Sequence, residues 1–317
     1  MAVTMAEITK LRKISGAGMM DCKNALTEAN GDIDKAMEII RKKGQAVAAK
    51  RSDREASEGC VLAKSTGQFA AIIALKCETD FVAKNADFVA LTQAILDAAV
   101  ANKCKTLDEV KALPLGNGTV QDAVTDRSGI TGEKMELDGY NVVEGAYTSI
   151  YNHQGNNQLC TIVAMNKEAE AAAHGVAMQI AAMNPIAIDE AGVPESVKEA
   201  EIQVAIDKTK KEQVDKAVEA ALKKAGINPA HVDSEEHMES NKAKEIIATV
   251  SAEKSANLPE AMIQNIAKGR LGKFLKEVCL LNQEDIMDGK KTVREVLKEI
   301  DPELQIVAFK RFTLRAE

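Results

Sequence analysis

Residues 59–100 have the sequence GCVLAKSTGQFAAIIALKCETDFVAKNADFVALTQAILDAAV, and this stretch decides the fold. Its first half alternates with period 2, so Cys60–Lys64, a turn at Thr66-Gly67 and Gln68–Lys76 predict a β-hairpin. In its second half apolar residues recur at helical spacing, which predicts a helix over Asp87–Asn102. A hairpin followed by a helix indicates an α+β architecture.

The same order of elements recurs later in the chain, at an offset of 86 residues (59 to 145). The second copy is predicted as a strand, a turn, a strand and a helix: Ala146–Asn152, His153–Gly155, Gln158–Met165 and Glu168–Asn184. The repeat is clearer in the order of elements than in residue identity. It predicts a core of two similar hairpin-plus-helix subdomains, at 55–139 and 140–317.

Three short helices are predicted before the first hairpin. Thr4 and Glu7 form a capping box for the first helix, Asp32 caps the third, and Gly44 is expected to end it. The polar stretch 50–59 is expected to be a linker. Residues 1–54 are therefore predicted to be a three-helix module with a linker, whose small core suits recognition rather than catalysis.

Residues 195–256 differ from the rest because they are rich in Lys, Glu and Ala. A narrow Ala- and Val-rich stripe between Val214 and Ala225 predicts one helix, which Gly226 ends, and a shorter helix follows. We expect a helical hairpin inserted into the second subdomain at about 207–256. Pro259 is expected to start another helix, and a final strand is predicted near 305–314.

Composition excludes several classes of protein. The net charge is −7; residues 1–55 carry 11 Lys and Arg against 8 Asp and Glu, a net charge of +3, so the remaining residues sum to −10. Long contact with nucleic acid is therefore not expected. The six Cys form no CxxC pair, and no uncharged apolar run reaches 18 residues. These patterns predict reduced thiols, no membrane span and a cytoplasmic location.

Enzyme motifs are absent from the sequence. The four His residues lack metal-ligand spacing, and neither the Gly-Ala-Gly at 16–18 nor the GRLGK at 269–273 has the spacing of a phosphate-binding loop. We expect no catalytic activity, no metal site and no cofactor.

The segment CETDFVAKN at 77–85 places a Phe among polar residues just after a predicted strand. One interpretation is an ordinary helix start, with Thr79 or Asp80 as N-cap and Phe81 in the core. The other is that Phe81 is exposed and contacts another molecule. The residues alone leave both interpretations open.

Four segments resemble the bacterial elongation factor Ts family. They are LRKISGAGMMDCKNAL at 11–26, IRKKG at 40–44, CETDFVAKN at 77–85 and GRLGKFLKEVCLLNQ at 269–283. The similarity covers about residues 4–206 and 257–314 in the same order.

The resemblance implies a ubiquitin-associated-like N-terminal module and a protein partner. That partner is elongation factor Tu in its GDP form, from which this family releases GDP during translation elongation. The segment Thr79, Asp80, Phe81 and Val82 is implied to lie beside the nucleotide site and dislodge Mg²⁺. Further partner contacts are implied for Arg12, Met19, Met20 and His153. Direct binding of nucleic acid or membrane is not expected.

Some positions depart from the family pattern. Ala74 and Lys76 replace Glu and Asn, Ser15 replaces Thr, and Gln179 stands where the family has a second His. The sequence does not fix the oligomeric state, and a homodimer stays open. Two other functions are weighed: a recognition scaffold for another partner, and a nucleic-acid-binding factor that uses residues 1–55.

Overall fold

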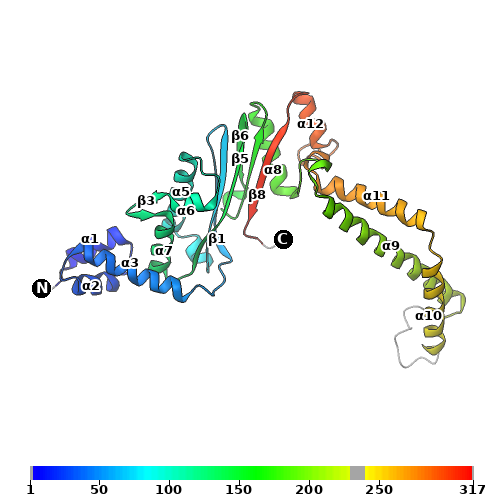
Figure 1. Cartoon of the computed structure of the whole chain (residues 1–317), viewed down its shortest axis with the longest axis horizontal. Coiled ribbons are helices and arrows are strands. Elements are labelled where there is room, and N and C mark those ends of the chain that lie inside the picture. The colour runs from blue at the N-terminus through cyan, green and yellow to red at the C-terminus, as the bar shows by residue number, and fades with distance from the viewer. Residues whose placement is uncertain (1–2, 229–239, 316–317) are drawn as a thin grey trace. The chain divides into compact units, whose positions relative to one another are not determined.

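The computed structural model describes residues 3–228 and 240–315, which belong to two compact units. The first unit combines Met1–Asn184 with Asp285–Glu317, and the second is Pro185–Glu284. The second unit is thus an insertion in the sequence of the first. Figure 1 shows the elements of both units.

The N-terminal module consists of α1 (Met5–Ser15), α2 (Met19–Glu28) and α3 (Ile33–Lys50). The capping box of Thr4 with Glu7 and the N-cap of Asp32 are both present, as predicted. The three helices enclose a small core centred on Leu11, Cys22 and Leu26. The prediction of three short helices is therefore confirmed for the first two, while the third is longer than expected.

Gly44 does not end α3, which is a correction to the sequence analysis. The helix continues to Lys50 because Gly44 is buried against Gly129 of α7 (Val120–Thr131). A Cβ atom on Gly129 would lie 2.0 Å from the Cα of Gly44, so the two backbones touch. The absence of a side chain at Gly44 allows this contact between helices, and the contact outweighs the usual tendency of Gly to end a helix.

The expected linker at 50–59 is also corrected. Arg51 and Arg54 both form ion pairs with Glu78, and β1 already begins at Glu58. The polar stretch is therefore fastened to the core by charge.

The first sheet has the antiparallel order β1-β2-β5, with β1 (Glu58–Ser65), β2 (Phe69–Cys77) and β5 (Met135–Glu144). The hairpin and the helix after it are confirmed. Between β2 and β5 the chain forms α4 (Asp80–Ala83), α5 (Ala86–Ala101), α6 (Leu107–Ala112), β3 (Pro114–Leu115), β4 (Gly118–Thr119) and α7. None of the elements from α6 to β5 was predicted from the sequence.

The second sheet repeats this pattern with the order β6-β7-β8. The strands are β6 (Tyr147–Asn152), β7 (Leu159–Met165) and β8 (Ile306–Thr313), and β7 leads into α8 (Glu170–Met183). A 3₁₀ turn, η1 (His153–Gly155), joins β6 to β7, and the short helix α12 (Val293–Ile300) precedes β8. The predicted second hairpin, its helix and the last strand are confirmed.

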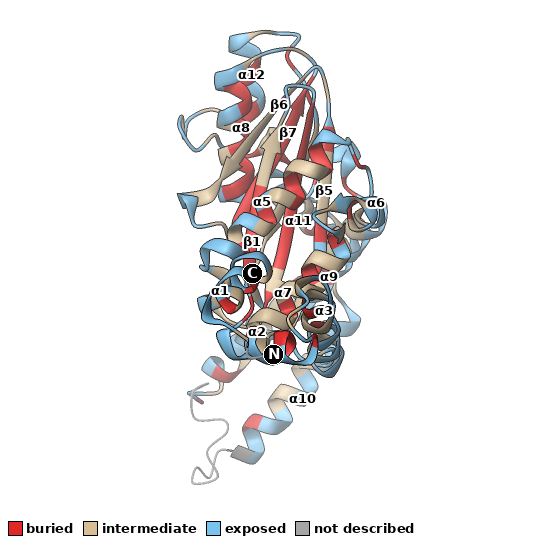
Figure 2. Ribbon diagram, turned by 90° about the vertical axis from the view of Figure 1, so that its left-hand side faces the viewer, coloured by how far each residue is buried: buried red, intermediate tan, exposed pale blue. Residues whose placement is uncertain are grey.

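The two sheets pack face to face with a helix on each outer face. Alternate residues of β2, such as Ile72, meet Ile162 and other residues of the second sheet, whereas Ile73 and its neighbours face α5. On the far side of β7, the Thr161 hydroxyl donates to the Ala177 carbonyl of α8 at 2.7 Å. The central strands β2 and β7 are accordingly almost fully buried, while α1 and α2 keep exposed faces (Figure 2).

The second unit is helical, and backbone hydrogen bonding joins the segments near its two ends. It contains η2 (Glu190–Gly192), α9 (Glu195–Lys224), α10 (Ser240–Ala256), α11 (Glu260–Val278) and η4 (Leu280–Asn282). A parallel bridge joins Ala187 to Cys279 near the two ends of the unit. Pro259 precedes α11, as predicted.

Two expected boundaries fall inside continuous elements. The limit between residues 139 and 140 lies within β5, and the start of the insertion at about 207 lies within α9. The compact helical unit is wider than predicted and spans Pro185–Glu284. Treating residues 1–54 as a separate domain stays a prediction.

The contact between Gly44 and Gly129 gives a first testable prediction. Gly129→Ala should lower the free energy of unfolding by about 1–3 kcal/mol, because the new methyl group must push α3 away from α7. The measurement is urea unfolding, together with trypsin cleavage after Arg51 and Arg54, which should become faster.

The matched control is Gly175→Ala in α8, where a Cβ would have no neighbouring atom within 4 Å. It should leave stability unchanged or raise it by up to about 1 kcal/mol. Equal effects of the two substitutions would show that the close approach of α3 and α7 is unimportant.

Candidate partner-binding site

The segment 79–82 forms a short helical turn between β2 and α5. Thr79 is the N-cap of the four-residue helix α4, and its side chain accepts a hydrogen bond from the Val82 amide at 3.5 Å. Asn85 then caps α5 through the amides of Asp87 and Phe88. The two N-caps, six residues apart, start two successive helices, so α4 is a single turn between the end of β2 and the start of α5.

Phe81 is 84% exposed, so the interpretation that buried it in the core is wrong. The other half of that interpretation is right, because Thr79 is indeed an N-cap. Val82 and Ala83 pack against the core of the first subdomain. With about 100° between successive helical residues, Phe81 then points away from that core.

Asp80 lies in the first turn of α4 and its carboxylate accepts from the Lys84 ammonium at 2.7 Å. This hydrogen bond from Lys84 lowers the pKa of Asp80, so the carboxylate is ionised at neutral pH. Both side chains are largely in solvent. An exposed ion pair of this kind is weak and exchanges readily for contacts with a partner.

The backbone before α4 is held by a reciprocal pair of carboxylates, which we call the carboxylate clasp (Glu78, Thr79, Glu133 and Lys134). The Glu133 carboxylate accepts from the Thr79 hydroxyl at 2.6 Å, the Thr79 amide at 3.1 Å and the Glu78 amide at 3.2 Å. In return, the Glu78 carboxylate accepts from the Lys134 amide at 2.6 Å. Neither Glu78 nor Glu133 was predicted to be a site residue from the sequence.

Glu78 also forms ion pairs with the two arginines that follow α3. Arg51 donates to both carboxylate oxygens, at 3.0 and 3.2 Å, and Arg54 donates at 3.0 Å. The backbone amide of Lys134 and these two arginines lower the pKa of Glu78 to about 2. The side chain is only 12% exposed, so it is a well-shielded anion at the base of α4.

The Cys77 thiol adds one more contact to this turn by donating to the Thr79 carbonyl at 3.2 Å. Burial and the nearby charge of Glu133 raise the pKa of Cys77 to about 12. The thiol therefore stays protonated and is a poor nucleophile. All six cysteines are buried.

The residues expected on the N-terminal module lie on its surface. Met19 and Met20 begin α2 and are 45% and 63% exposed, and Arg12 is exposed near the end of α1. Met5 and Ile14 of α1 are exposed as well. The module thus presents large apolar side chains that its own core does not use.

His153 lies in η1, the turn between β6 and β7. Tyr151 separates two imidazoles, with ring centroids 5.8 Å from both His153 and His174. Gln179 is buried, and its side-chain oxygen accepts from the Ile286 amide at 2.9 Å. The expected residues therefore lie on three separate segments: α1–α2, α4 and η1.

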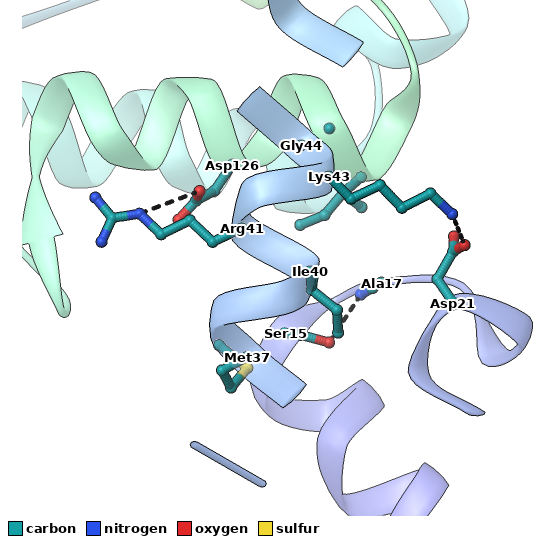
Figure 3. Close-up of a pocket in the computed structure, with 11 residues that line it drawn as sticks. Ser15, Ala17, Asp21, Met37, Ile40, Arg41, Lys43, Gly44 and Asp126 are labelled. Carbon is teal, nitrogen blue, oxygen red and sulfur yellow. Dashed lines mark hydrogen bonds and ion pairs between the residues drawn. The ribbon is translucent and has the colours of Figure 1, made fainter. Parts of the chain in front are cut away.

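The positive charge of residues 1–55 is mostly neutralised within the structure. Six of its eleven cations form ion pairs: Lys35, Arg41, Lys42, Lys43, Arg51 and Arg54. Figure 3 shows Arg41 directed to Asp126 and Lys43 to Asp21, on opposite sides of α3. The pairing weakens the case for nucleic-acid binding by this segment.

The hollow in Figure 3 does not favour a nucleotide site. It has a volume of about 50 Å³ and lies between α3, α7 and the turn after α1. Sites for ligands of nucleotide size are typically several hundred Å³. This hollow is therefore part of the junction between helices.

Comparison with known proteins identifies the family. A model of the family described as elongation factor TS matches residues 78–316. The chain belongs to the elongation factor Ts family. It is 93% identical to elongation factor Ts of Phocaeicola vulgatus and 48% identical to that of Porphyromonas gingivalis, and each comparison covers all of both chains. Family membership makes it a translation elongation factor that acts in protein biosynthesis.

The elongation factor Ts match begins at Glu78 and therefore includes both α4 and Glu133. Within the described residues, no three or more His, Cys, Asp or Glu side chains are grouped to hold a metal ion. Across the same part of the chain, none of the helices is long and apolar enough to cross a bilayer.

The low pKa of Glu78 predicts a pH-dependent contribution to stability. Because this pKa is lower in the folded chain than the ordinary value of 4.5, the ionised form stabilises the fold. The contribution is complete above pH 4.5 and is lost as pH falls toward about 2.

We therefore expect the wild type to be more stable than Glu78→Gln at neutral pH. The difference should shrink by about 1 kcal/mol between about pH 5 and pH 3.5. Urea unfolding of both proteins at each pH measures it. A difference that stays constant over this interval would contradict the assignment.

Proposed function

We propose that this chain promotes release of GDP from elongation factor Tu by placing Phe81 beside the nucleotide site and displacing Mg²⁺. The chain performs no chemical step of its own. Its membership of the elongation factor Ts family supports this partner. The observation that carries the proposal is an exposed Phe81 on a helix whose backbone is firmly anchored.

The displacement of Mg²⁺ is a sensible route to GDP release. Mg²⁺ requires near-octahedral oxygen ligands at about 2.1 Å and is usually shared between phosphates and few protein groups. A small shift of its support removes much of the charge neutralisation that holds the diphosphate. No catalytic group is needed for this, which agrees with a site made of Thr79, Asp80, Phe81 and Val82.

Phe81 supplies only part of the energy required. Burying its side chain in the partner contributes about 1.5–3 kcal/mol, which corresponds to roughly 10–150-fold in rate or affinity. A broader interface must supply the remainder. The exposed Met19 and Met20 of the N-terminal module are suited to it, because Met adapts to irregular apolar surfaces. We assign further contacts to Arg12 and His153.

Phe81→Ala tests the proposal directly. It should slow GDP release by roughly 10–150-fold without changing thermal stability, because the side chain makes little contact with its own core. Stopped-flow fluorescence of labelled GDP on elongation factor Tu measures the rate. Asp80→Ala should act in the same direction and more weakly, because Asp80 has to give up its ion pair with Lys84 before it can contact the partner, which offsets part of that contact.

Met287→Ala is the matched control, because Met287 is also large, apolar and 77% exposed in the first unit. It should leave GDP release unchanged. The reaction is then repeated after Mg²⁺ is removed with a chelator, where the difference between wild type and Phe81→Ala should become small. An unchanged ratio would mean that Phe81 does not act through Mg²⁺, and normal release by Phe81→Ala would rule out the proposal.

A further inference from the structure

The anchoring of α4 is stronger than so short a helix requires for packing alone. Four residues cannot hold a helical conformation by themselves, because helix nucleation is unfavourable. Phe81 contributes nothing to the core, and only Val82 and Ala83 are packed against it. The conformation of α4 therefore depends on the hydrogen bonds at its N-terminal end.

Those hydrogen bonds converge on one side chain. Both oxygens of Glu133 are used: Oε1 accepts from the Thr79 hydroxyl, and Oε2 accepts from the amides of Thr79 and Glu78. The same Thr79 hydroxyl oxygen accepts from the Val82 amide inside α4. A single hydroxyl thus joins the Glu133 carboxylate to the helix that carries Phe81.

Glu133 is itself held in place by the end of α7. Gly132 ends this helix in a left-handed conformation, the Glu133 amide donates to the Thr131 hydroxyl at 3.3 Å, and the Ser128 hydroxyl donates to the Glu133 carbonyl at 2.5 Å. The carboxylate therefore projects from a fixed point of the scaffold.

We propose that Glu133 is a positioning residue for GDP release, which fixes the direction in which Phe81 is presented to the partner. The proposal rests on the proposed function. An exposed side chain gives its full burial energy to a complex only if its backbone is already ordered, because ordering on binding costs free energy. Glu133 supplies this order before the partner arrives.

The clasp also connects α4 to the N-terminal module. Arg51 and Arg54 bind Glu78 just beyond the end of α3, and α3 contacts α7 through Gly44 and Gly129. The segment after α3 and the C-terminal end of α7 therefore meet at the base of α4. A partner that contacts both the module and Phe81 therefore binds two surfaces whose supporting segments both contact Glu78.

The test is a double-mutant cycle between Glu133→Gln and Phe81→Ala. Gln has the shape of Glu but lacks the charge, and one of its two polar atoms is a donor, so it cannot accept from both the Thr79 hydroxyl and the two backbone amides. In the wild-type background, Glu133→Gln should slow GDP release by roughly 10-fold, and by no more than Phe81→Ala does. In the Phe81→Ala background it should have little further effect, since its contribution passes through Phe81.

Glu136→Gln is the control, because Glu136 is a nearby exposed carboxylate of β5 that pairs with the ammonium group of Lys134, whereas the clasp uses the backbone amide of Lys134. It should leave the rate unchanged. Hydrogen exchange provides a readout independent of activity: amides of residues 79–84 should exchange faster in Glu133→Gln and not in Glu136→Gln. Rates are normalised to the folded fraction from thermal melts.

If Glu133→Gln fails to fold, Thr79→Val replaces it, because Val keeps the shape of Thr and removes the hydroxyl. Thr79→Val should slow release, and Thr79→Ser, which keeps the hydroxyl, should restore it. Slowing by Glu133→Gln that is equal in both backgrounds would overturn the positioning assignment. So would normal release by Glu133→Gln alongside slow release by Phe81→Ala, which would leave the proposed function standing. Normal release by Phe81→Ala would refute both.

Discussion

The burial of β2 on both faces is the constraint on which the rest of the first unit depends. One set of alternate residues packs against α5, and the other packs against the second sheet. A strand with two buried faces needs a layer on each side, so the duplicated hairpin-plus-helix units must stack. The loop that leaves this strand at Cys77 consequently starts from a fully buried residue.

The stacking of the sheets in turn depends on small residues. A Cβ on Gly139 would lie 2.6 Å from both the Ala74 methyl group and the Phe312 ring. The low aromatic content of the chain is consistent with this close approach, because few large rings have to fit between the layers.

Local signals explain what the sequence could predict. The capping box of Thr4, the N-cap of Asp32 and both hairpins depend on residues a few positions apart, and all are found. Gly44 was assigned wrongly because its partner Gly129 is distant in sequence. β5 escaped prediction because its sequence, MELDGYNVVE, lacks clean alternation, and it pairs where β2 offers a free edge. Glu133 likewise acts 54 residues from Thr79, beyond the reach of any local pattern.

The insertion of the helical unit between α8 and β8 has a consequence for synthesis on the ribosome. β7 pairs with β8 from Met165 to Ile306, so 141 residues must be translated before the last strand can join its sheet. At about 5–20 residues per second, this takes roughly 7–28 s. During that time one edge of β7 has unpaired backbone groups, which can pair with another chain. The nascent chain therefore exposes this strand edge until its final strand emerges.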